Sequence, residues 1–282
     1  MTAGRLPLFC GTALAERIER AEAQLIAKAG AAARRRRADE AGFVLPVAGG
    51  VACFAGADSP YNKVAGLGFG GAPGPAVWEQ IEQAYAAVGA PVRVELADLA
   101  HPAIGAVLTG RGYPLVLFDN VLGQVLRVGT ERVRPPGVEI RPSGEEEFES
   151  WLDVVLHGFA CPDAPGGAGH EEIPRKVLAG AARDFAAAGG TRYIALRDGV
   201  IVGAARLHIA EGVAQLAGAT TAPAHRRRGV QAALLSARLA HAAAAGCDIA
   251  VVTTLPGSKS QQNAQRQGFD LLYARAALLR QA

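Results

Sequence analysis

Cysteine is sparse in this chain of 282 residues, and its four cysteines form no C-x-x-C pair. None of them has a histidine at a spacing typical of zinc ligands, so we expect no metal site. Isolated cysteines of this kind are typical of reduced thiols in a reducing compartment. The sequence therefore predicts a cytoplasmic protein with free, mostly buried thiols.

Long hydrophobic runs are also missing. No stretch reaches the roughly 18 apolar residues that a membrane span needs. Residues 1–20 lack the continuous apolar core of a signal peptide. We therefore expect no membrane partner.

A strong excess of charge of one sign is absent as well. The chain has 29 basic and 26 acidic residues, which gives a net charge of +3. Four consecutive arginines, Arg34–Arg37, end the first predicted helix, where cations suit the helix dipole. A nucleic-acid contact at this run is the alternative, but so small a net charge makes nucleic acid an unexpected partner.

Hydrophobic residues make up 50% of the chain, and their periodicity predicts a similar order of elements twice. In the first half we expect a helix at 12–38, strands at 43–46, 51–54 and 64–69, a helix at 75–88, a strand at 92–96, a helix at 102–110 and a strand at 113–125. In the second half we expect a strand at 138–141, helices at 145–157 and 171–187, strands at 191–197, 200–209 and 213–221, a helix at 229–245, a strand at 248–254, a helix at 258–267 and a strand at 269–279. The proline-rich segment 133–137 separates the two series.

The repeated order predicts an α/β (α+β) protein with two similar domains, residues 1–134 and 138–282. Each domain is expected to have a central twisted sheet flanked by helices. A length of 282 residues also fits two ordinary domains better than one.

A basic turn follows the predicted strand 213–221. It contains Arg226, Arg227 and Arg228, and the next helix begins at Gly229. A helix N-terminus presents unpaired N–H groups and a positive dipole end, and glycine lets the backbone approach an anion closely. The turn therefore predicts a diphosphate site. The alternative is a basic loop that caps a helix and binds no ligand.

This turn resembles motif A of the GNAT N-acetyltransferase superfamily, written Gln/Arg-x-x-Gly-x-Gly/Ala. Arg226, Gly229 and Gln231 stand at its three defined positions, although Gln231 replaces a small residue. The resemblance extends over about residues 138–282, because a strand, a short helix, a Gly-Phe step and a last strand follow the turn. It implies tandem GNAT-like domains, with acetyl-CoA as co-substrate and an amine as acceptor.

The resemblance also implies which residues contact acetyl-CoA. They lie at the end of strand 213–221, in the turn and in the last short helix: Ala219, Thr220, Thr221, Arg226, Arg227, Arg228, Gly229, Val230, Gln231, Ser258 and Asn263. Gly218 is expected to mark a bulge at which this strand diverges from its neighbour. A backbone N–H of the strand would then polarise the acyl carbonyl.

The groups that move protons are not where the family usually has them. Ala264 occupies the usual position of a proton-donating tyrosine, and strand 213–221 contains no acid. The catalytic candidates are therefore His208, Ser260 and Asn263. The ordinary pKa of histidine suits a base near neutrality, although a histidine on a strand is also explained by packing.

The first half has no counterpart of the basic turn. Residues 68–75 occupy the matching place without a basic residue, and Pro73 and Pro75 remove two N–H donors. This half resembles a degenerate GNAT-like domain. A polar cluster at residues 61–63 is a candidate lining of an acceptor cleft between the domains. Asp163, in a Gly/Pro-rich loop, is a candidate for binding an acceptor ammonium or for stabilising a turn.

Two hypotheses about function follow. The first is an N-acetyltransferase that transfers an acetyl group to a primary amine of an unidentified small molecule by direct attack. The alternative is a catalytically weak or inactive module that binds or senses acyl-CoA, which the missing tyrosine and strand acid favour. The sequence is compatible with either a monomer or a homodimer.

Overall fold

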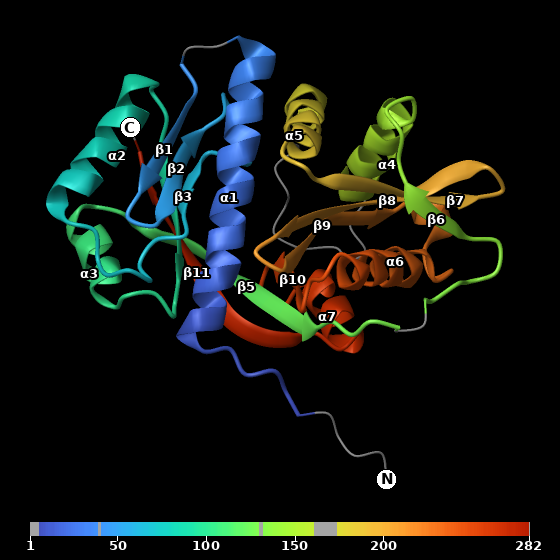
Figure 1. The fold of residues 1–282 in the computed structure, drawn as a ribbon. Coiled ribbons are helices and arrows are strands. Elements are labelled where there is room, and N and C mark those ends of the chain that lie inside the picture. The colour runs from blue at the N-terminus through green and yellow to red at the C-terminus, as the bar shows by residue number, and fades with distance from the viewer. Residues whose placement is uncertain (1–5, 39–40, 130–131, 161–173, 282) are drawn as a thin grey trace.

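A computed structural model describes residues 6–38, 41–129, 132–160 and 174–281. The protein is a mixed α/β structure built on one large sheet with helices on both faces (Figure 1). The helices are α1 (Thr12–Arg37), α2 (Pro75–Ala87), α3 (Ala103–Gly110), α4 (Phe148–Ala160), α5 (Arg175–Ala187), α6 (Val230–Ala244) and α7 (Lys259–Arg266). The strands are β1 (Phe43–Val47), β2 (Gly50–Phe54), β3 (Lys63–Ala65), β4 (Val92–Ala97), β5 (Leu115–Val125), β6 (Glu139–Pro142), β7 (Thr191–Arg197), β8 (Val200–Ala210), β9 (Val213–Thr221), β10 (Ile249–Thr254) and β11 (Asp270–Arg280).

The predicted order of elements is confirmed, with one clear error of length. The strand expected at 64–69 ends at Ala65. Gly66 and Gly68 have φ angles of +80° and +95°, which an extended strand does not tolerate. The predicted helix at 171–187 is described from Arg175 onward, because residues 161–173 lie outside the described part of the chain.

The last strand of each half is exchanged into the other half. The strand order is β1-β2-β3-β4-β11-β5-β10-β9-β8-β7-β6. β11 therefore lies between β4 and β5, and β5 lies between β11 and β10, with antiparallel pairing throughout. Because the sheet is continuous across the linker, the division into 1–134 and 138–282 stays a prediction about the repeat and does not describe two separate sheets.

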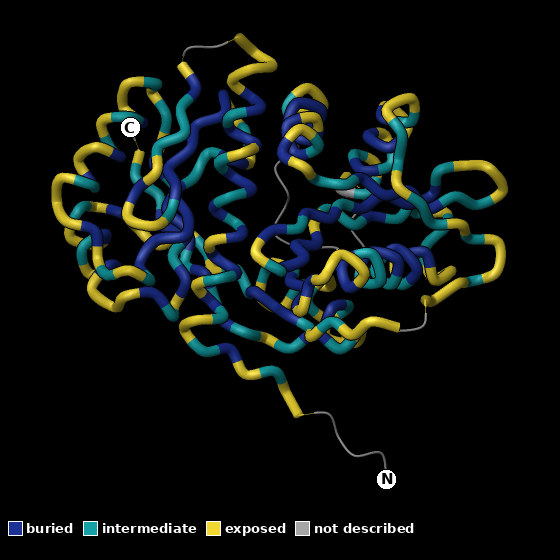
Figure 2. Tube along the Cα trace, in the orientation of Figure 1, coloured by how far each residue is buried: buried dark blue, intermediate teal, exposed yellow. Residues whose placement is uncertain are grey.

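Helix α1 packs over the sheet between the two halves (Figure 1). Its N-terminal part is buried with Val121, Val213 and Tyr273, and its C-terminal part is buried with Cys53 of β2 and Phe185 of α5. Figure 2 shows buried and intermediate residues along most of α1 and exposed residues at its C-terminal end. The helix therefore fixes the orientation of both halves.

The described cysteines are Cys10, Cys53 and Cys247, and all three are buried and free. Burial raises the pKa of the Cys10 thiol to about 11 and that of Cys53 to about 12. At neutral pH these thiols are protonated and unreactive. None of the helices in the described ranges is long and apolar enough to cross a lipid bilayer.

The exchange of β5 and β11 predicts that the two halves unfold together. Trp78 lies in the first half and Trp151 in the second, and both are fully buried. Variants Trp78→Phe and Trp151→Phe each leave one fluorescent reporter. We expect each reporter to show the same denaturant midpoint as the circular dichroism of its own variant. Separate midpoints within one variant would contradict a single cooperative unit.

Candidate active site

β9 and β10 begin side by side and then separate. Their parallel pairing covers Val213–Leu216 against Ile249–Val252 and stops there. Within the described part of the chain, β9 continues to Thr221 without a partner strand on this edge, while the end of β10 pairs with β5. The open edge of β9 therefore offers backbone groups to an extended ligand, as a sheet edge does in β-strand addition.

A bulge lies in β9 at the point of separation. Ala204 pairs with Thr220, but Arg206 pairs with Ala217, so two residues of β9 face Ala205. One of these two is Gly218, whose φ angle is +56°. The bulge expected at Gly218 is thus confirmed. It changes the direction in which the backbone groups of the open edge point.

The N-terminus of α6 follows this open edge. Its N-cap is Gly229, with a φ angle of +77°, and no side chain caps the helix. The first helical bond runs from Ala233 N to Gly229 O, so the N–H groups of the preceding turn have no partner within the helix. Arg227 and Arg228 are exposed beside them. The turn therefore combines free donors, a positive dipole end and fixed positive charge, which fits a diphosphate.

The turn packs against the linker segment 133–137. A Cβ atom at residue 229 would lie 2.8 Å from Cγ of Pro135, so glycine is required by contact as well as by φ. Arg226 is held by its Nε, which donates to the carbonyl oxygen of Thr221 at 3.3 Å. The hydroxyl oxygens of Thr221 and Thr254, at the ends of the separating strands, are buried without a hydrogen-bond partner. These polar atoms fit a site that receives a polar ligand.

Helix α7 borders the same turn. Nδ2 of Asn263 donates to Oε1 of Gln231 at 3.3 Å, so Gln231, which departs from the motif, is turned toward α7. Ser258 is the N-cap of α7, and its Oγ accepts from the N–H of Gln261. Ser260 is exposed, and Ala264 is buried in the core. Contacts of Ser258, Ser260 and Asn263 with a cofactor remain predictions.

His208 is 1% exposed on β8. Its Nδ1 lies 2.8 Å from Oε1 of Gln215, and Nε2 of Gln215 donates to Glu22 of α1 at 2.8 Å. Burial lowers the pKa of His208 below its ordinary value, and the bond to Gln215 opposes this effect. His208 is therefore neutral at pH 7 and connected to the α1 face of the sheet through Gln215.

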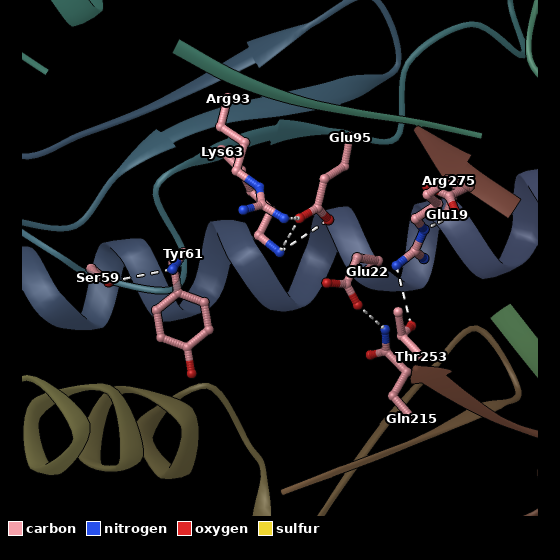
Figure 3. Close-up of polar contacts among 10 residues, drawn as sticks. All are labelled: Glu19, Glu22, Ser59, Tyr61, Lys63, Arg93, Glu95, Gln215, Thr253 and Arg275. Atoms are coloured by element: carbon pink, nitrogen blue, oxygen red, sulfur yellow. Dashed lines mark hydrogen bonds and ion pairs between the residues drawn. The ribbon is translucent and has the colours of Figure 1, made fainter. Parts of the chain in front are cut away.

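Charged side chains from the first half continue along this face (Figure 3). Nζ of Lys63 bonds both carboxylate oxygens of Glu95 at 3.0 Å, and Arg93 lies 3.1 Å from the same carboxylate. Burial would raise the pKa of Glu95, but these cations hold it at about 2. With Ser59, Pro60 and Asn62 they line a cavity of about 260 Å³. Lys63 and Asn62 therefore line a polar cavity in the structure, and its role as an acceptor cleft stays a prediction.

Asp119 is a half-buried carboxylate on β5 that no sequence motif identifies as a candidate. It lies on β5 opposite Arg275, one strand from the end of β10. Burial and the charge of Glu95 raise its pKa, while Arg93, Lys63 and Arg275 oppose the rise. Within the described ranges it forms no hydrogen bond or ion pair. Only the exchange of β5 brings this acid next to the second half.

The remaining predicted site residues lie partly inside and partly outside the described part of the chain. Asp163 lies outside the described residues, so its role stays a prediction. Among the residues that the structure describes, no group of three His, Cys, Asp or Glu side chains is arranged to hold a metal ion. Ala219, Thr220 and Val230 lie on the β9 edge and in the first turn of α6, as expected from the order of elements.

Comparison with known proteins shows which family and which solved structures the chain resembles. Residues 159–269 match the model of the Acetyltransferase (GNAT) family. A GCN5-related N-acetyltransferase from Kribbella flavida has a similar structure, with a TM-score of 0.65, 22% identity and coverage of 95% of this chain and 96% of that one. A tandem GNAT protein from the clavulanic acid biosynthesis pathway gives a TM-score of 0.60 at 13% identity, with 97% of both chains covered. No curated protein sequence matches the chain significantly.

Proposed function

We propose that the protein transfers an acetyl group from acetyl-CoA to a primary amine of a small molecule, since residues 159–269 match the model of the Acetyltransferase (GNAT) family. One observation carries the proposal. The uncapped N-terminus of α6, flanked by arginines, adjoins the edge at which β9 leaves β10. A diphosphate site and an open strand edge in this arrangement suit the two polar parts of coenzyme A.

The proposed roles follow from position. The N–H groups of Val230 and Gln231, with Arg226 and Arg228, bind the diphosphate. Backbone groups of residues 217–221 bind the amides of the pantetheine arm. The bulge at Gly218 places an N–H group toward the acyl carbonyl, where it stabilises developing negative charge.

The reaction is direct transfer. A base removes a proton from the acceptor ammonium, and the amine nitrogen forms a bond to the acetyl carbon. The carbon–sulfur bond breaks with its electron pair on sulfur, the nitrogen gives up its second proton to a side chain or to water, and the thiolate takes a proton from a side chain or from water. The products are an amide and the free thiol. Ser260 and Asn263 of α7 remain the proposed groups near the sulfur.

The base is proposed to be His208 or Asp119, and pH dependence separates the two. A base must be deprotonated, so kcat/KM falls as the pH drops through its pKa. We expect an acidic limb below pH 6.5 for His208, whose pKa is lowered by burial. His208→Gln removes this limb if His208 is the base, whereas Asp119→Asn removes it if Asp119 is. Initial rates from pH 4.5 to 8 measure the profile, and a limb that survives both variants would contradict both assignments.

A second function is favoured by one observation. The usual tyrosine position holds the buried Ala264, so the described part of α7 has no phenolic donor. A module that binds acyl-CoA without efficient transfer is therefore the alternative proposal. Release of free CoA in the presence of a broad amine panel distinguishes them. Amine-dependent release supports the enzyme, and tight binding with no release across the panel supports the module.

A further inference from the structure

A half-buried arginine, whose Nε is buried without a hydrogen-bond partner among the described residues, lies beside the bulge in β9. Arg206 is on β8, and Ala217, its neighbour in the register, is the first residue of β9 that β10 no longer pairs. A Cβ atom at residue 218 would lie 2.8 Å from Nε and 2.9 Å from Nη2 of Arg206. The guanidinium thus lies directly along Gly218, where the two strands separate.

The Nε–H group of Arg206 is a donor without an acceptor among the described residues. Its Nε is buried and has no hydrogen-bond partner. Its guanidinium carbon lies 5.3 Å from the ring centre of Phe185 in α5, which covers one face of the group. No ion pair or hydrogen bond of this side chain is found within residues 6–38, 41–129, 132–160 and 174–281. An unpaired buried donor costs free energy, so an anion that reaches it is favoured.

Other basic side chains in the interior have acceptors for their N–H groups, which the Nε–H group of Arg206 does not have among the described residues. Arg275 pairs with Glu19, and Lys63 pairs with Glu95. Arg238, which has no acidic partner among the described residues, donates instead to two backbone carbonyls, including that of Arg206. Arg206 therefore differs from each of these in having neither a carboxylate nor a carbonyl.

The charge of Arg206 is directed toward the face that carries α1 and α5. Burial raises the pKa of the Tyr61 hydroxyl to about 12, and the charge of Arg206 opposes this rise. Tyr61 donates to the carbonyl oxygen of Ala181 in α5 and is among the side chains in Figure 3. Phe185 packs against Arg206 and is buried in one cluster with Tyr61, whereas Ala205 and Leu207, the neighbours of Arg206 on β8, pack with α6 on the other face of the sheet.

We propose that Arg206 binds a carboxylate group of a reactant at the bulge, so that one of the two reactants carries a carboxylate near the reacting atoms. The planar guanidinium suits a carboxylate through paired N–H donors. The carboxylate belongs either to the acceptor, which is then an amino acid, or to the acyl group, which is then a dicarboxylic monoacyl group. This proposal rests on the proposed acyl transfer at the β9 edge.

Matched substrate pairs test the proposal in two arms. In the first, acetyl-CoA is combined with an amino acid or with the amine that its decarboxylation gives: lysine with cadaverine, ornithine with putrescine, phenylalanine with phenethylamine. In the second, succinyl-CoA is compared with acetyl-CoA on the simple amines, and calorimetry compares the affinities of the two thioesters. We expect the carboxylate-bearing member of one arm to be preferred by roughly 10- to 100-fold in kcat/KM.

Variants of Arg206 test whether this residue causes the preference for the carboxylate-bearing reactant. Arg206→Gln is expected to abolish the preference, and Arg206→Lys to retain part of it, because a lysine keeps the charge but not the paired donors. Arg197→Gln, on the neighbouring strand β7, is the matched control and should leave the preference unchanged. Thermal unfolding of each variant checks folding, and a preserved affinity for acetyl-CoA shows that the cofactor site is intact.

The outcomes are distinguishable. A preference in either arm that disappears in Arg206→Gln supports the proposal and identifies which reactant carries the carboxylate. Normal acetyl-CoA binding with no preference in either arm, including no turnover at all, overturns it while the cofactor assignment stands. A preference that survives Arg206→Gln also overturns it. Failure of the wild-type protein to bind acetyl-CoA would overturn the proposed function and this assignment together.

Discussion

Replacing Arg226 and Arg228 by glutamate is expected to weaken acetyl-CoA binding at least about 100-fold. Each arginine would lose a charge-assisted bond to phosphate worth about 1.5–3 kcal/mol, and each glutamate would repel the diphosphate. Because about 1.4 kcal/mol corresponds to a factor of ten, two such losses exceed two orders of magnitude. Calorimetric titration of the wild-type protein and the double variant with acetyl-CoA measures the change.

The control for this experiment is a second double variant with the same change in net charge at a different place on the protein. Arg34 and Arg35 are exposed at the end of α1, so Arg34→Glu with Arg35→Glu alters the net charge equally. We expect this pair to change the affinity by less than about threefold, because exposed charges far from a site are screened by salt. An equal loss of affinity in both double variants would show that the effect comes from net charge in general. Unchanged affinity in the double variant Arg226→Glu, Arg228→Glu would reject the loop as the diphosphate site.

Removing the carboxylate of Glu19 is expected to destabilise the fold by about 3–5 kcal/mol, the usual cost of leaving one partner of a buried ion pair. Oε1 of Glu19 accepts from Nε of Arg275 at 2.7 Å and from the hydroxyl of Tyr273 at 2.6 Å, and both charged side chains are almost fully buried. Burial alone would lower the pKa of Arg275, but the charge of Glu19 raises it well above its ordinary value. Denaturant unfolding of Glu19→Leu measures the loss of stability.

A double variant distinguishes a broken pair from poor packing. In Glu19→Leu with Arg275→Met no charge of the pair is left buried, so much of the lost stability should return. Glu211 at the surface provides a control, because its bond to Arg20 is exposed and Glu211→Gln should cost less than about 1 kcal/mol. A double variant that is no more stable than Glu19→Leu would show that the ion pair itself is not the source of the effect.

The local features of this fold could be predicted from the sequence. Helical and alternating periodicity depends on a few neighbouring residues, so the order of elements and the position of the basic turn were predicted correctly. Gly218 and Gly229 were assigned a bulge and a helix start, and both have positive φ angles in the structure. The length of β3 was predicted wrongly, because the apolar residues after Ala65 suggested a strand that Gly66 and Gly68 interrupt.

The partners of the strands could not be predicted. β5 and β11 have similar lengths and similar places in the repeat, so the sequence gives no reason for either to pair across the halves. The register alone brings Asp119 beside the end of β10 and Arg206 opposite Ala217. A charged residue on a strand is normally a surface residue, and only its tertiary neighbours show that it is half-buried and lacks a partner. The surroundings of these two residues therefore depend on strand pairing, which local sequence patterns do not predict.

A crystal structure of the protein with acetyl-CoA tests the central claim most directly. We expect the diphosphate at the N-terminus of α6, within hydrogen-bond distance of the N–H groups of Val230 and Gln231. We also expect the pantetheine arm along residues 217–221, with the thioester at the bulge of Gly218. Coenzyme A bound elsewhere, or bound with its diphosphate away from residues 226–231, would show that this turn is not the diphosphate site.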